Sequence, residues 1–131
     1  MIIADADAWI DFWRHPSSET AAAMDSLIRD ERVGLIGIVL AELQRGFRDD
    51  GERLRMNDML EGLPYVEMTR DTWEHAGRIA GELDSTGLSI PITDACIAAV
   101  AIESGHEVLT RDRHFERIPG LHLYKPEGDT Q

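Results

Sequence analysis

The stretch TDACIAAVAIES, residues 93–104, decides the fold class. Eight consecutive residues inside it, 95–102, are apolar, so a helix formed by this stretch has no polar face. A helix that is apolar on every side is buried in the interior of a domain. We therefore predict a helix over residues 93–104 that is packed on all sides and is ended by Gly105.

Short apolar runs typical of buried strands occur before and after this helix. The predicted strands are residues 1–4, 34–37, 65–68, 107–110 and 121–124. The predicted helices are residues 8–14, a helix from the capping Ser17 or Ser18 to residue 29, and residues 38–48, 52–61, 71–85 and 93–104. Because strands and helices alternate, the sequence predicts a three-layer α/β fold with a mainly parallel central sheet flanked by helices.

Length and composition predict one domain over residues 1–131. The chain has 131 residues and is 43% hydrophobic, which is enough to bury one core. It does not start with a basic segment followed by an apolar one, and its longest apolar run, 95–102, is too short to span a bilayer. We expect a cytoplasmic protein with no membrane segment.

The charge and the single cysteine exclude some classes of protein. Cys96 is the only cysteine, so the chain has no intramolecular disulfide. The formal net charge of −12 counts against loose binding to nucleic acids, because neutralising phosphates normally requires a basic surface. An interaction with a nucleic acid would therefore need local compensation by cations or basic side chains.

Acidic residues follow the predicted strands. Asp5 and Asp7 come after the first strand and Asp112 comes after the fourth, while Asp94 begins the apolar helix. Glu42 lies early on the helix after the second strand. In open α/β sheets, polar groups that do chemistry gather outside the carboxyl ends of the strands. We expect four or five carboxylates to converge at this edge.

Converging carboxylates repel one another, and a divalent cation held by oxygen ligands is the natural compensation. Mg²⁺ fits best, with Mn²⁺ as a substitute, because Mg²⁺ prefers octahedral oxygen coordination and keeps several waters. Zinc is disfavoured, since the five histidines and Cys96 show no H-E-x-x-H or C-x-x-C spacing.

Each carboxylate also has a purely structural explanation. Asp7 could cap the helix predicted to begin near residue 8, and Asp112 could cap a short helix toward residue 117. Asp94 could be a first-turn acid favoured by the helix dipole. Glu42 borders the apolar stripe of its predicted helix and could be a rim residue.

Four blocks of the sequence resemble a known family. They are IIADADAWIDF from residue 2, VLAELQRGF from residue 39, PITDACIAA from residue 91 and VLTRDRHF from residue 108. Their order and spacing resemble those of PIN-domain ribonucleases, and specifically of VapC toxins from toxin–antitoxin (VapBC) pairs. The resemblance covers nearly the whole chain and implies a PIN-like fold.

The resemblance implies a Mg²⁺-dependent endoribonuclease toxin that cuts structured RNA such as tRNA or rRNA. It matches Asp5 and Asp94 to the principal metal ligands, and Glu42, Asp112 and Thr110 to the catalytic residues. Glu42 or Asp112 would orient or deprotonate the attacking water, and Thr110 would support the acids. The implied partners are the RNA substrate, a VapB-like antitoxin and a second copy of the chain in a homodimer.

Two positions depart from the family pattern. Ala6 and Asp7 stand where the family usually has Thr-Ser or a similar pair, so Asp7 could recruit a second metal ion or weaken the binding of RNA phosphates. His114 stands where an aspartate is common, and we expect it to be a surface residue. The candidate phosphate-binding residues near the acids are Arg45, Arg111 and Arg113.

Two alternatives remain open from the sequence. Asp5-Ala6-Asp7 after an apolar strand matches the D-x-D motif of haloacid-dehalogenase-type phosphatases, in which Asp5 would be the nucleophile. The chain is short for that fold and has only one lysine, Lys125. The other alternative is a non-catalytic PIN-like binding domain whose site Asp7 has spoiled.

Overall fold

The computed structural model describes residues 1–126 and contains one five-stranded sheet. The strands are β1 (Ile2–Ala4), β2 (Val33–Ile36), β3 (Tyr65–Val66), β4 (Glu107–Leu109) and β5 (His122–Leu123). The helices are α1 (Ala6–Arg14), α2 (Glu19–Arg29), α3 (Gly37–Gly46), α4 (Asp50–Leu60), α5 (Arg70–Ser85), α6 (Ile92–Ser104) and the 3₁₀ helix η1 (Arg113–Arg117).

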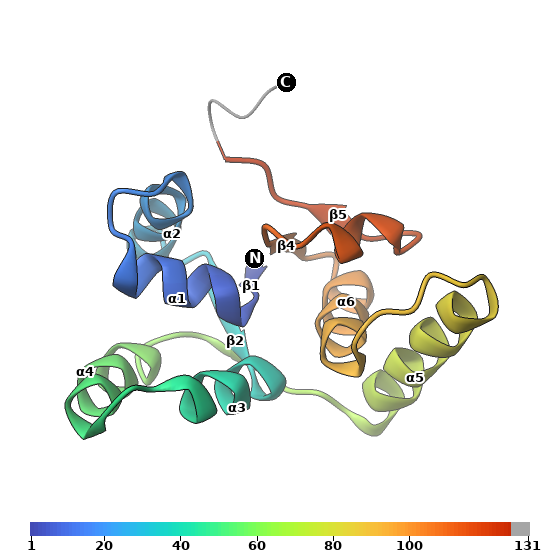
Figure 1. Ribbon diagram of the computed structural model, residues 1–131, viewed down its shortest axis with the longest axis horizontal. Helices are drawn as coiled ribbons and strands as arrows, with labels where there is room; N and C mark the ends of the chain where they lie inside the picture. Colours follow the sequence, from blue (N-terminus) through green and yellow to red (C-terminus); the bar gives the residue numbers. More distant parts are fainter. Residues whose placement is uncertain (127–131) are drawn as a thin grey trace.

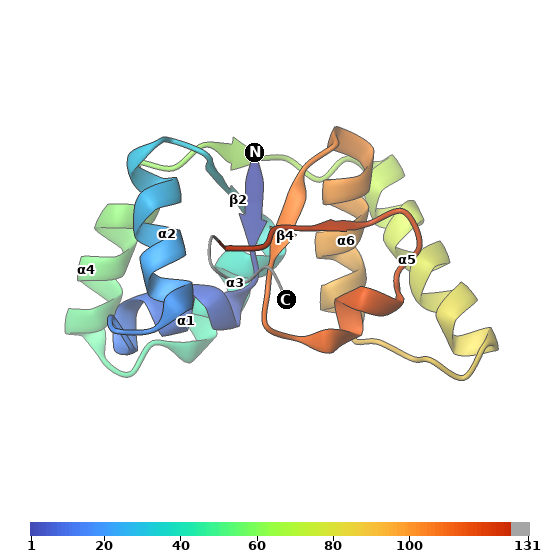
Figure 2. The same cartoon turned by 90° about the horizontal axis from the view of Figure 1, so that it is seen from above.

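The strand order is β3-β2-β1-β4-β5, and all four neighbouring pairs are parallel. Helices α1, α2 and α4 lie on one side of the strands, and α5 and α6 lie on the other (Figures 1 and 2). The predicted three-layer α/β fold with a parallel sheet is therefore confirmed.

Helix α6 is the centre of the core, as its unbroken apolar run predicted. All residues from Ala95 to Ala101 are at most 2% exposed. Facing strand β1 is equally buried, and its central Ile3 pairs with both Gly34 of β2 and Val108 of β4. Burying each large aliphatic side chain contributes about 1.5–3 kcal/mol, so this helix and strand hold the layers together.

The predicted element bounds differ from the structure by at most two residues, at helix ends as well as at strand ends. The third strand was predicted over residues 65–68, but β3 ends at Val66 because the chain turns toward Thr69, which caps α5. Tyr65 at this edge is 49% exposed. Short edge strands of this kind are common because an edge has only one pairing partner.

The topology gathers several chain segments at one edge. Since β1, β2 and β4 run parallel, their carboxyl ends share that edge, where α1, α3 and the segment leading to η1 begin. Among residues 1–126, no helix combines the length and the apolar character needed to cross a bilayer.

Candidate metal centre

Asp5 stands at the end of β1 and is the N-cap of α1. Its Oδ1 accepts a hydrogen bond from the backbone N–H of Ala8 at 2.9 Å, and its Oδ2 accepts one from the hydroxyl of Thr110. Thr110 Oγ1 in turn accepts a hydrogen bond from the backbone N–H of Asp112 at 2.9 Å. Thr110 therefore connects the ends of β1 and β4 and orients the Asp5 carboxylate.

Burial dominates the electrostatics of Asp5, which is only 6% exposed. Burial raises the pKa of Asp5 from 3.8 to about 6, although the hydrogen bonds from Thr110 and Ala8 oppose the shift. The negative charges of Asp7 and Asp94 raise it further. A carboxylate destabilised in this way gains strongly from a nearby cation, because the cation restores the charged form.

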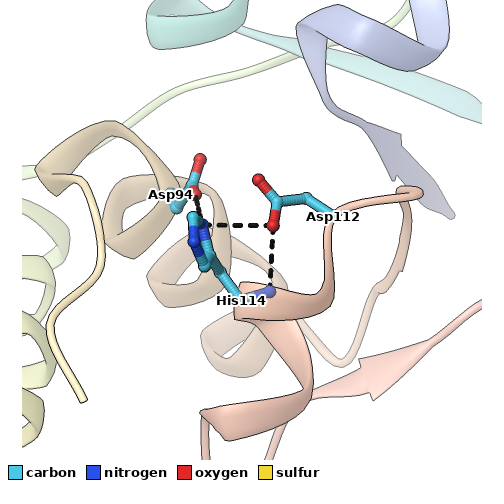
Figure 3. A group of neighbouring side chains, drawn as sticks. All are labelled: Asp94, Asp112 and His114. Carbon is cyan, nitrogen blue, oxygen red and sulfur yellow. Dashed lines mark hydrogen bonds and ion pairs between the residues drawn. The ribbon is translucent and has the colours of Figure 1, made fainter.

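Three side chains from two further segments meet beside this edge (Figure 3). Asp94 lies in the first turn of α6, Asp112 is the N-cap of η1, and His114 lies in η1. His114 Nδ1 lies 3.1 Å from Asp112 Oδ1 and 3.5 Å from Asp94 Oδ2. One donor atom from each of the three residues lies within 4.8 Å of the other two, which is compact enough to hold a metal ion.

Asp94 and Glu42 are electrostatically coupled to this cluster. Burial raises the pKa of Asp94; His114 opposes the shift by hydrogen bonding, and the charge of Asp112 adds to it. Burial is also the largest cause that raises the pKa of Glu42, and the negative charges of Asp94 and Asp7 raise it further. The half-buried Glu42 on α3 therefore lies close enough to Asp7 of α1 and Asp94 of α6 for their charges to affect its ionisation, as is typical of carboxylates at one site.

Of the helix-capping roles suggested for Asp7 and Asp112, the structure shows only that of Asp112. Asp7 does not cap α1, because the helix begins at Ala6 and Asp5 occupies the cap; Asp7 is an exposed first-turn acid. Asp112 does cap η1, accepting the backbone N–H of His114 at 2.9 Å. Asp5 and Asp112 therefore each cap a helix and also lie at the acidic edge of the sheet.

His114 is partly exposed at the surface, but one atom of its ring faces the acidic cluster. Its side chain is 38% exposed, but its Nδ1 is buried and faces the two carboxylates. The spacing R-D-R-H cannot show that η1 turns Nδ1 of the imidazole back toward Asp94 of α6.

Arg111 lies beside the acids but is already paired, since its Nη1 donates to Asp11 Oδ2 at 2.7 Å. Asp11 was missed from the sequence, although it follows Asp7 by one helical turn and so shares its face of α1. A hollow of about 380 Å³ lies here, lined by Asp7, Ile10, Asp11, Arg111 and Asp112. This hollow opens beside the acidic edge on the side of α1.

The other two candidate arginines form no ion pair with the acids among residues 1–126. Arg113 is exposed, and its Nε lies 3.6 Å from Oε2 of Glu116 in the same helix, which makes a weak surface ion pair. Arg45 is exposed in the last turn of α3, and within residues 1–126 it forms no ion pair with the acids.

The donor set fits a divalent cation. It combines carboxylates, of which Asp5 and Asp94 have raised pKa values, with the buried Nδ1 of His114, which faces Asp94 and Asp112. Carboxylate oxygens are preferred ligands of Mg²⁺, and imidazole nitrogen is a common ligand of transition metals. Fold and site together define an α/β domain with an acidic cluster at the carboxyl edge of a parallel sheet, compact enough to hold a metal ion.

The family model for the PIN domain matches residues 2–121, and the chain belongs to the PIN domain family. The family predicted from the four sequence blocks is thereby confirmed. Membership of this family counts against the haloacid-dehalogenase-type phosphatase suggested by the D-x-D motif.

Named relatives are similar along nearly their whole length. The chain is 31% identical over 124 residues to "VapC ribonuclease Mb1587" of Mycobacterium bovis, covering 90% of this chain and 91% of the relative. It is 28% identical over 115 residues to "Ribonuclease VapC2" of Rickettsia felis, covering 84% and 85%.

Solved structures share the fold. VapBC2 from Rickettsia felis bound to a DNA fragment from the promoter superposes with a TM-score of 0.80 at 24% identity, covering 95% of this chain and 98% of that one. VapBC from Salmonella typhimurium, also DNA-bound, superposes with a TM-score of 0.77 at 22% identity, covering 94% of this chain and 96% of that one. At these identities the likeness establishes the fold only.

Proposed function

We propose that this chain is the metal-dependent endoribonuclease toxin of a type II toxin–antitoxin system. The observation that carries the proposal is the buried Asp5 at the end of β1, held by Thr110 and electrostatically coupled to Asp94. The ribonuclease relatives support the same activity, since their similarity extends over about nine-tenths of this chain.

Asp5 and Asp94 are the residues proposed to hold the metal, with Mg²⁺ as the physiological ion, Mn²⁺ as a substitute and Asp7 as an additional ligand. When bound, the ion supplies charge stabilisation at the phosphodiester and activation of water. Glu42 or Asp112 accepts a proton from the attacking water. Thr110 acts as a positioning residue, because its hydroxyl orients the Asp5 carboxylate.

RNA is the proposed substrate, in the form of tRNA or rRNA, and cleavage leaves a 5′-phosphate and a 3′-hydroxyl. Arg111 is the best placed phosphate-binding candidate, because it lines the hollow beside Asp7 and Asp112. Arg45 and Arg113 would contact phosphates farther from the site. These local cations and the bound metal offset the net charge of −12 where RNA approaches.

A VapB-like antitoxin is the proposed partner, with a homodimer as the assembly and the cytoplasm as the compartment. The acidic edge and the strongly negative chain favour a basic inhibitory segment, since opposite charges steer association. The VapBC composition of the structural neighbours supports such a pair.

A metal-titrated cleavage assay tests the activity. Asp5→Asn and Asp94→Asn should each abolish cleavage of structured RNA while circular dichroism stays unchanged. Asp58→Asn on the exposed face of α4 is the matched control and should cleave normally. Metal-dependent turnover of p-nitrophenyl phosphate without RNA cleavage would favour a phosphatase, and no turnover of either substrate would favour a binding domain.

A further inference from the structure

His114 is the only nitrogen donor in the compact cluster formed with Asp94 and Asp112 among the described residues. Its Nδ1 is buried and lies between the two carboxylates, in ion-pair contact with both (Figure 3).

The distances within the cluster fit coordination of one ion. Two donors that each lie about 2.1 Å from an octahedral cation are about 3 Å apart when they occupy adjacent positions. His114 Nδ1 lies 3.1 Å from Asp112 Oδ1 and 3.5 Å from Asp94 Oδ2. Small side-chain adjustments would therefore bring all three donors onto one cation.

The fold holds the imidazole at this place independently of any ion. Asp112 caps η1 through the backbone N–H of His114, which fixes the start of the helix. Phe115, the next residue, is 1% exposed and anchors η1 in the core. His114 is thus pre-positioned at the acidic edge, as a metal ligand requires.

We propose that His114 is a direct ligand of the metal ion and that its nitrogen shifts the preference of the site from Mg²⁺ toward divalent transition metals such as Mn²⁺. Mg²⁺ favours all-oxygen coordination, whereas imidazole nitrogen is a ligand typical of transition metals. The inference rests on the proposed metal-dependent function and deepens it by naming the ligand that sets metal choice.

Direct metal binding tests the inference. Metal-stripped wild type and His114→Asp are titrated with MnCl₂ and with MgCl₂ by isothermal titration calorimetry. Outer-shell changes at metal sites cost roughly 10–100-fold in affinity, so replacing a direct ligand should lower the Mn²⁺-to-Mg²⁺ affinity ratio by about tenfold or more. His15→Asn, at an exposed histidine after α1, should leave the ratio unchanged.

Pulsed electron paramagnetic resonance of the Mn²⁺-loaded wild type gives a second readout that does not depend on the folding of a variant. A directly coordinated imidazole should give ¹⁴N modulation of the Mn²⁺ echo, and His114→Asp should lose it. Absence of ¹⁴N modulation in the wild type, or an unchanged affinity ratio in His114→Asp, overturns the inference. If the wild type still cleaves RNA with metal in that case, the proposed function stands without it.

Discussion

Replacing Asp5 by Asn should stabilise the metal-free protein and at the same time remove its ability to gain stability from metal. Burial raises the pKa of Asp5 from 3.8 to about 6. The folded state therefore holds the proton more tightly than the unfolded state, and stability falls as pH rises through this interval. A difference of about two pKa units corresponds to about 3 kcal/mol of destabilisation well above pH 6.

The asparagine side chain avoids this penalty because it carries no charge. It can still accept a hydrogen bond from Ala8 or Thr110, and losing one of the two bonds costs about 1 kcal/mol. Asp5→Asn should therefore raise the free energy of unfolding by about 2 kcal/mol at pH 8. The gain should be smaller by about 1 kcal/mol near pH 5.3, where folded Asp5 is largely protonated.

Urea unfolding in EDTA at the two pH values, followed by circular dichroism, measures these quantities, with Asp58→Asn as the control. Adding MgCl₂ at pH 8 should then stabilise the wild type and leave Asp5→Asn unchanged, because a ligand stabilises only the state that binds it. Equal destabilisation of Asp5→Asn at both pH values, or equal stabilisation of both proteins by metal, would refute the reasoning.

Three further predictions concern Thr110, Arg111 and Ile97. Thr110→Val removes the hydroxyl that favours the charged form of Asp5, so its pKa should rise further and metal binding should require a higher pH, as titration calorimetry across pH would measure. Arg111→Ala should weaken RNA binding. It should also reduce the slope of log K against log[salt] by about one, the contribution of one phosphate contact, as filter binding at several salt concentrations would measure. Ile97→Ala should destabilise the fold by about 2–5 kcal/mol in urea unfolding, because Ile97 is fully buried in α6.

Matched variants separate these effects from general damage. Thr110→Ser keeps the hydroxyl and should bind metal at the wild-type pH; an unchanged pH dependence in Thr110→Val would contradict the role of the hydroxyl. Arg53→Ala on exposed α4 should leave RNA binding intact, and the same loss in both arginine variants would argue against a local contact at Arg111. A loss below 1 kcal/mol in Ile97→Ala would mean that α6 is not close-packed.

Periodicity and position along the chain were sufficient to predict much of the fold and several candidate site residues. The apolar run in residues 95–101 required a buried helix, and the alternation of strand and helix required a parallel sheet. Since parallel strands end at one edge, Asp5 and Asp112 could be assigned to that edge from their places after β1 and β4. These features depend on local pattern and on general rules of topology.

Only the tertiary structure decided how the side chains at that edge meet. Thr110 donates to Asp5 across 105 positions of the sequence, and Arg111 pairs with Asp11 across 100. The turn of His114 toward Asp94 likewise depends on the packing of η1 against α6. Local pattern determines which residues reach the edge, but contacts between distant segments depend on ångström-scale packing that no local pattern encodes.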